Sequence, residues 1–244
     1  MIRGPIGLPG MANVHSHAFQ RLLRGRVQRR APDREDSFWT WREAMYALAD
    51  SLDVQQIEDA SRLCFVECLE AGYTAVGEFH YLHNQSSGVP YPDPMETTQA
   101  IVRAARQAHI RLSLLWTVYV QGGFKEALSP RQRRFSVLAQ DDVRRALDRL
   151  EKLCEGPRMS YGLALHSVRA VPTSWLGPLA EEARNRDIPL HIHVSEQPKE
   201  VTDCKEATGR SPVGLLDEEE RQAARADRRD RARERREEWD ADGD

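Results

Sequence analysis

The segment Met11-Ala12-Asn13-Val14-His15-Ser16-His17 predicts a first strand that ends near Val14 and leads directly into His-Ser-His. A dinucleotide-binding sheet would carry a glycine-rich phosphate loop at this place, and none follows the strand. The segment therefore counts against that fold. Because side chains alternate along a strand, the imidazoles of His15 and His17 are expected on the same side, where two nitrogens can chelate one metal ion.

Helical and strand-like segments alternate along the rest of the chain. Asp53 is placed to cap a helix whose apolar residues recur at helical spacing, and Gly72 closes that helix. Five strand-then-helix periods predict an α/β fold with a parallel sheet, either doubly wound or a (β/α)8 barrel. Both architectures build their sites at the carboxyl ends of the strands. The later strands are expected over 73–79, 111–120, 159–165 and 188–194, and the later helices over 95–108, 141–153 and 174–186.

The composition indicates a globular protein with no general attraction for polyanions. The chain has 244 residues, 40% of them hydrophobic, and a net charge of -3. It can therefore form a core, and neither nucleic acid nor an anionic membrane is an expected partner. No segment approaches the roughly 18–20 apolar residues of a membrane span, and the N-terminus lacks the apolar core of a signal peptide. The four cysteines form no CxxC motif, so core thiols in a reducing cytoplasm are expected.

The last 28 residues, 217–244, differ from the rest of the chain. They are almost wholly Arg, Asp, Glu and Ala, with Trp239 as the only large apolar residue. Such a segment cannot join a hydrophobic core and is expected to be a solitary helix or disordered. We therefore divide the chain into a partial barrel over 1–216 and a charged tail over 217–244.

Histidines gather at the ends of the predicted strands. Six of the eight in the chain do so, including His166 after the fourth strand and the pair His191 and His193 in the fifth. A lone His-x-His is usually a pair of satisfied polar side chains, but its repetition at equivalent strand ends favours a metal site. Imidazole suits zinc, and a catalytic zinc needs about three protein ligands with one position open. His15, His17 and one histidine of the fifth strand would supply that set, with Glu196 placed to move protons.

Several of these segments resemble a known family. Residues 9–17, Pro-Gly-Met-Ala-Asn-Val-His-Ser-His, resemble the opening of the amidohydrolase superfamily barrel, and His193-Val194-Ser195-Glu196 resembles the HxxE of its deaminase branch. Residues 18–20, 37–43, 77–83 and 166–169 add a specific likeness to the formimidoylglutamate deiminase family of histidine breakdown. The likeness extends over about residues 8–210.

The resemblance implies a metal-dependent hydrolase on a (β/α)8 TIM barrel. Carried over position by position, it implies that His15, His17 and His193 bind one Zn²⁺ and that Glu196 shuttles protons. The substrate would be held by Gln20, Arg42, Tyr81, His166 and Arg169. The implied substrate, N-formimidoyl-L-glutamate, is a small dicarboxylate, and a guanidinium is the side chain best shaped to grip a carboxylate. The implied reaction is hydrolysis of a non-peptide C–N bond to N-formyl-L-glutamate and ammonia.

The sequence departs from the family pattern after the fifth strand. The family has a further histidine and a metal-binding aspartate there, and neither is identified in this sequence. The expected fold is therefore an incomplete barrel of about five β/α units, with activity far below that of a complete relative. Two unpaired strand edges would favour association, so a homo-oligomer or a completing chain is an expected partner.

Two alternatives stay open. The first keeps the amidohydrolase chemistry but takes an aminated heterocycle, which calls for aromatic and amide contacts; the two arginines argue against it. The second is a catalytically dead remnant that acts as an interaction module. Phe38, Trp39 and Trp41 fit either the core or a dimer surface, with the core favoured.

Overall fold

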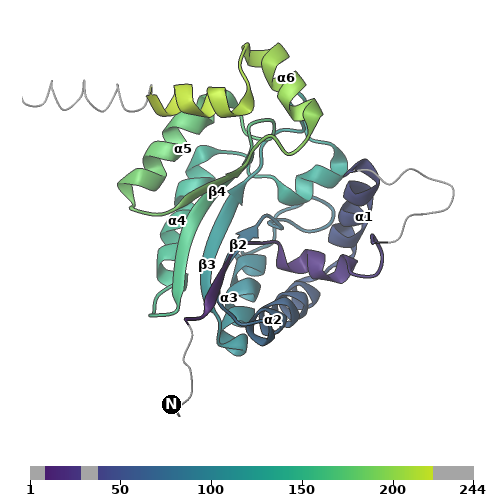
Figure 1. The fold of residues 1–244 in the computed structure, drawn as a ribbon, viewed down its shortest axis with the longest axis vertical. Helices are drawn as coiled ribbons and strands as arrows, with labels where there is room; N and C mark the ends of the chain where they lie inside the picture. The colour runs from purple at the N-terminus through teal and green to yellow at the C-terminus, as the bar shows by residue number, and fades with distance from the viewer. Residues whose placement is uncertain (1–8, 29–37, 222–244) are drawn as a thin grey trace, which may run out of the picture.

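Five parallel strands form one curled sheet, an open half-barrel (Figure 1). The structure is a computed structural model and describes residues 9–28 and 38–221. The strands lie side by side in chain order, so each connection crosses to the neighbouring position, as in a (β/α) barrel. This confirms the predicted α/β class and incomplete barrel. The strands are β1 (Met11–Ser16), β2 (Tyr73–His80), β3 (Arg111–Val118), β4 (Met159–Ser167) and β5 (Leu190–His193).

Helices cover the outer face of the sheet, and α1 lies across the carboxyl ends of the strands (Figure 1). As predicted, Asp53 caps α2 in a capping box with Gln56, and Gly72 follows the helix with a positive φ of 88°. The helices are α1 (Phe38–Ser51), α2 (Val54–Glu70), α3 (Glu96–Ala108), α4 (Gln140–Leu153), α5 (Thr173–Asn185) and α6 (Pro198–Thr208), with 3-10 turns η1 (Ala18–Leu23) and η2 (Pro130–Phe135).

The core lies between the sheet and these helices. The middle strands β3 and β4 are buried on both faces, which matches their nearly continuous apolar sequences. Leu112 and Leu114 of β3 are buried, and so are Ile101 of α3 and Leu147 of α4. Cys64 and Cys68 pack against this core, as predicted, and all four cysteines are free thiols.

The first strand extends further than predicted. It ends at Ser16 rather than near Val14, because β1 pairs with β2 as far as Ser16 and Glu78, with a register shift after Asn13. The two strands approach closely at Gly77, where an added Cβ would lie 2.8 Å from the carbonyl oxygen of Val14. Glycine at position 77 therefore lets β1 bring its histidines against β2.

The predicted boundary between barrel and tail falls within a helix. Residues 212–221 are helical, and Leu215 in this segment is buried. The first five residues of the predicted tail thus continue a helix that begins in the body. The rest of the tail, residues 222–244, lies outside the described residues.

The close approach at Gly77 gives a prediction for stability. Gly77→Ala is expected to lower the free energy of unfolding by about 1–3 kcal/mol, because the new methyl group overlaps backbone that cannot move independently. Urea denaturation monitored by circular dichroism measures this change. Gly177→Ala in α5 is the matched control, since its Cβ would meet only Glu219 Oε2 at 3.5 Å. The control should stabilise the helix by roughly 0.5–1 kcal/mol. Equal stability of Gly77→Ala and the wild type would contradict the packing argument.

Candidate metal centre and substrate pocket

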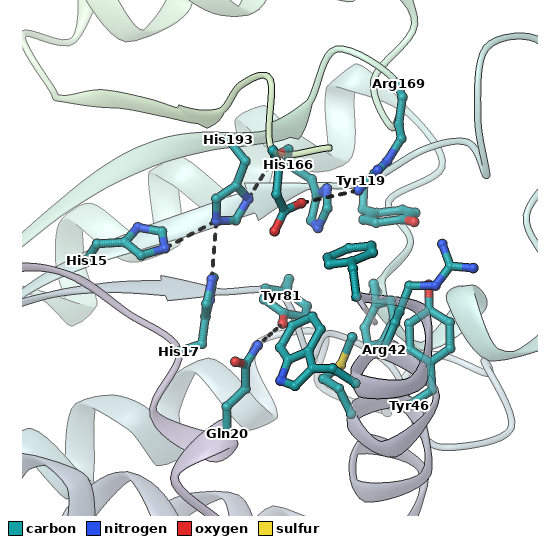
Figure 2. Close-up of a pocket in the computed structure, with 15 residues that line it drawn as sticks. His15, His17, Gln20, Arg42, Tyr46, Tyr81, Tyr119, His166, Arg169 and His193 are labelled. Carbon is teal, nitrogen blue, oxygen red and sulfur yellow. Dashed lines mark hydrogen bonds and ion pairs between the residues drawn. The ribbon is translucent and has the colours of Figure 1, made fainter. Parts of the chain in front are cut away.

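A cavity of about 270 Å³ opens at the carboxyl ends of the strands (Figure 2). This is the end at which both candidate architectures build their sites. All nine residues singled out from the sequence line it, although they come from segments far apart in the chain. They are His15, His17, Gln20, Arg42, Tyr81, His166, Arg169, His193 and Glu196.

Three imidazoles converge at one side of the cavity. Nε2 of His193 lies 3.2 Å from Nε2 of His17 and 3.2 Å from Nε2 of His15. Figure 2 shows the three rings pointing toward one another, two from the end of β1 and one from the end of β5. Among the described residues, this is the one group of at least three metal-binding side chains whose ligand atoms all lie within 4.8 Å of one another.

Backbone carbonyls orient two of these rings. The Nδ1–H of His17 donates to the carbonyl oxygen of Phe79 (2.9 Å), and the Nδ1–H of His193 donates to that of His166 (3.0 Å). A proton on Nδ1 leaves Nε2 with a free lone pair. Unprotonated nitrogens that face one another at this distance repel unless a cation lies between them. The donor set therefore fits a divalent metal that accepts imidazole ligands.

The surroundings keep the ligands neutral. Burial, and then the neighbouring His193, lower the pKa of His17 to about 3, although the hydrogen bond to Phe79 opposes the shift. Burial and His15 lower the pKa of His193 to about 4. The pKa of His15 is also lowered, by burial and by His191. Neutral imidazole is the form that binds metal, so at pH 7 protons do not compete for these sites.

Glu196 follows β5 on a strained turn. The preceding residue, Ser195, has a left-handed φ of 55°, and its N–H donates to the buried carboxylate of Glu200 (3.0 Å). Glu196 forms an ion pair with Arg169 at 3.6 Å. Burial raises the pKa of Glu196, the Arg169 guanidinium opposes this shift, and Glu200 adds to it. The net rise favours a carboxyl group that can both take up and release a proton.

The other side of the cavity carries two guanidinium groups and several polar side chains. Arg42 lies over the ring of Trp39 at 4.4 Å, and its Nε is buried without a partner among the described residues. Gln20 donates to the hydroxyl of Tyr81 at 2.8 Å. His166 is neutral because burial, then His193, lower its pKa well below the ordinary value. A free guanidinium in a partly buried site is suited to an anionic ligand.

Several aromatic side chains that line the cavity were not predicted from the sequence. Phe38 lines the cavity and Trp39 is 40% exposed, so the preference for the core is wrong for these two residues. Trp41 packs against the core, as preferred, and also lines the cavity. Helical spacing defines an apolar face but not what that face covers. The further lining residues are Met45, Tyr46, Tyr119 and Phe135.

Two predicted strand-end histidines lie elsewhere. His80 points to the opposite face of β2, where it is buried and its Nε2 lies 3.2 Å from the Thr97 hydroxyl. His191 lines a second cavity on the inner face of the sheet, together with Asn13 and Arg111. The fifth strand therefore contributes His193, not His191, to the histidine cluster.

Comparison with known proteins shows the family of this chain. The sequence matches the Amidohydrolase family over residues 6–226. The chain belongs to this family.

Relatives of this amidohydrolase include several deaminases. The chain is 44% identical to the formimidoylglutamate deiminase of Pseudomonas aeruginosa, covering 86% of this chain and 46% of that protein. It is 27% identical to the 5'-deoxyadenosine deaminase of Methanoregula boonei, covering 88% and 42%. The chain thus spans about half the length of the curated relatives that it matches.

Solved structures show the same fold. The crystal structure of an amidohydrolase from Brucella melitensis superposes with a TM-score of 0.80 at 42% identity, covering 86% of this chain and 46% of that one. An adenosine deaminase from Xanthomonas campestris, solved with bound zinc, superposes with a TM-score of 0.62 at 21% identity, covering 86% and 42%.

The low pKa values of the buried histidines give a prediction for acid stability. The unfolded chain takes up protons at histidine near pH 6.5, whereas His17, His193 and His83 stay neutral in the folded chain down to about pH 3–4. The unfolded state therefore binds more protons below pH 6.5, and the metal-free protein should lose stability as the pH falls from about 6.5 to about 4. Urea denaturation at pH 7.5, 6 and 5 measures this loss. The double variant His17→Asn, His193→Asn should show a weaker dependence, and an unchanged slope would refute the assignment.

Proposed function

We propose that this amidohydrolase is a metal-dependent deiminase that hydrolyses the formimidoyl C–N bond of N-formimidoyl-L-glutamate. The products are N-formyl-L-glutamate and ammonia. The observation that carries the proposal is the presence, in one cavity, of three convergent imidazoles, a carboxyl group and two guanidinium groups. The 44% identity to a formimidoylglutamate deiminase supports the choice of substrate.

His15, His17 and His193 would hold the metal. Three nitrogen ligands with an open position are typical of catalytic zinc, and a structural neighbour carries bound zinc, so we propose Zn²⁺. When bound, the metal supplies a water of near-neutral pKa as the nucleophile and stabilises charge at the reacting carbon. The cluster contains no carboxylate ligand among the described residues.

Glu196 would act as the general base and general acid of the reaction. Its raised pKa allows the carboxyl group to collect a proton from the attacking water and deliver it to the departing nitrogen. Addition of water to the formimidoyl carbon gives a tetrahedral centre, and protonation of its terminal nitrogen releases ammonia. The C=O of the formyl product then replaces the C=N of the substrate.

Arg42 and Arg169 would bind the two carboxylates. Arg42 has no ion pair among the described residues, and Arg169 has only the 3.6 Å pair with Glu196, so both can form charge-assisted hydrogen bonds to a ligand. Gln20, Tyr81 and His166 would hold the rest of the substrate from the floor of the cavity. Fixing both ends of the molecule orients the formimidoyl group toward the histidine cluster.

A second candidate is deamination of an aminated heterocycle. The aromatic rings of Phe38, Trp41 and Tyr119 and the amide of Gln20 are the contacts that such a ring would need. The two guanidinium groups favour the dicarboxylate instead, since a neutral heterocycle would leave them without a counter-charge.

We also propose that the protein works in the cytoplasm on this small dicarboxylate. The free state of all four cysteines supports a reducing compartment. Along the part of the chain that the structure describes, no helix has both the length and the apolar character to span a bilayer.

The proposed function is tested by measuring metal content and ammonia release on the same size-fractionated sample. We expect about one zinc per chain and ammonia release from formimidoylglutamate that exceeds release from guanine or adenosine. His193→Ala should lose both. Glu196→Gln should keep the zinc and lose about 10²–10⁴-fold in rate.

The outcomes separate the alternatives. Faster release from a heterocycle would favour the second candidate. Zinc without ammonia release would contradict the deiminase proposal for this chain while supporting the metal centre. Neither zinc nor release would favour the remnant hypothesis.

Carboxylate recognition can be tested without catalysis. Calorimetric titration with glutarate should give weaker binding for Arg42→Met and Arg169→Met by about 10–100-fold, because each loses hydrogen bonds between charged groups. Arg103→Met is the control, since Arg103 is paired with Glu58 on the outer helices. Equal affinity in all four proteins would contradict the assignment of the arginines.

A further inference from the structure

A buried carboxyl group lies directly behind the histidine cluster. Glu78 of β2 is 1% exposed, on the face of the strand that the helices cover. Burial raises its pKa to about 7, and the hydrogen bond from Ala18 opposes this shift. Its Oε2 has no partner among the described residues. Such a group is costly to bury, so stability alone gives no reason for glutamate at this place.

The partners of Glu78 flank the ligand His17. Its Oε1 accepts the backbone N–H of Ala18 at 2.7 Å, and the Ser16 side chain lies near enough to favour its charged form. Ser16 is paired with Glu78 across the two strands. The carboxyl group therefore holds the residue after His17, and the strand pairing holds the residue before it, at the point where β1 ends and η1 begins.

Phe79, the next residue of β2, holds the imidazole ring of the same histidine through its backbone. The carbonyl oxygen of Phe79 accepts the Nδ1–H of His17 at 2.9 Å. Glu78 thus fixes the backbone around His17, and Phe79 fixes the ring. Neither contact reaches the convergent Nε2 atom, which stays free for a metal.

The buried carboxylate of Glu58 is held in a different way and serves as a comparison. Glu58 of α2 is 6% exposed, and its partners are the cation Arg103 (2.8 Å) and the amide of Gln107 (3.1 Å). Glu58 connects two helices through an ion pair. Glu78 has no cation partner among the described residues, and its hydrogen bond goes to the backbone of the residue after His17.

We infer that Glu78 is a positioning residue for the metal centre, holding the Ser16–Ala18 backbone so that His17 presents Nε2 to the metal. This inference rests on the metal centre proposed above. The contact that matters is the acceptor oxygen for the Ala18 N–H. A side chain that keeps this oxygen in place should keep the site, and one that cannot reach Ala18 should loosen it.

The test is the zinc affinity of the 244-residue chain, measured by competition with a chromophoric chelator. Glu78→Ala and Glu78→Asp are expected to weaken zinc binding by about 10–100-fold, the usual effect of losing a group that orients a ligand. Aspartate retains the charge but is too short to reach Ala18. Glu78→Gln retains the acceptor oxygen and should bind zinc nearly as tightly as the wild type. The absorption spectrum of bound Co²⁺ should change in the alanine and aspartate variants and stay the same in the glutamine variant.

Glu58→Ala is the matched control for general loss of stability. It removes a buried carboxylate remote from the histidines, so it should lower the melting temperature and leave zinc affinity unchanged. If Glu78→Ala does not fold, Glu78→Asp decides.

Each remaining outcome refutes a particular statement. Wild-type affinity in Glu78→Asp would overturn the positioning role and leave the proposed function intact. Loss of affinity in Glu78→Gln equal to that in Glu78→Asp would also overturn it, because an acceptor oxygen within reach of the Ala18 N–H would then not preserve the site. A wild-type chain that binds no zinc would refute the metal centre, and the positioning role with it.

Discussion

The contact between β1 and β2 decides where the chemistry of this protein can lie. A glycine at position 77 lets the first strand approach the backbone of the second, and Phe79 supplies the carbonyl that orients His17. With a larger side chain at position 77, β1 would be displaced and its two histidines would move with it. The site is thus built by backbone contacts within the sheet before any side chain of the cavity is considered.

The cavity separates two kinds of chemistry. One side carries neutral imidazoles that are protected from protonation by burial, and the other carries the permanently charged Arg42 and Arg169. Glu196 lies between them, paired with Arg169. A ligand carboxylate that binds Arg169 competes with Glu196 for the same guanidinium. In the proposed function, binding of the substrate would therefore be linked to the release of the carboxyl group that would move its protons.

The order of strands and helices and the location of the site at the strand ends could be predicted from the sequence, because apolar periodicity and caps such as Asp53 act locally. All nine residues singled out from the sequence line one cavity. The aromatic lining of the cavity could not be predicted, since the spacing of Phe38 and Trp41 defines a helix face without saying where the helix lies. The positioning role inferred for Glu78 could not be predicted from the sequence either. A single glutamate in an apolar strand has a meaning only when the turn that it contacts is known.

The sheet order has a consequence for how the site holds together. His15 and His193 come from β1 and β5, which are four positions apart, and strands so placed in a flat sheet would lie about 19 Å from each other. Their Nε2 atoms are nevertheless 3.2 Å apart, so the curvature of the sheet and the reach of the two side chains together close that distance. A metal bound there would link the first and last strands of the half-barrel. The metal affinity would then depend on the curvature of the whole sheet. Changes in packing far from the cavity would alter that affinity if they changed the curvature.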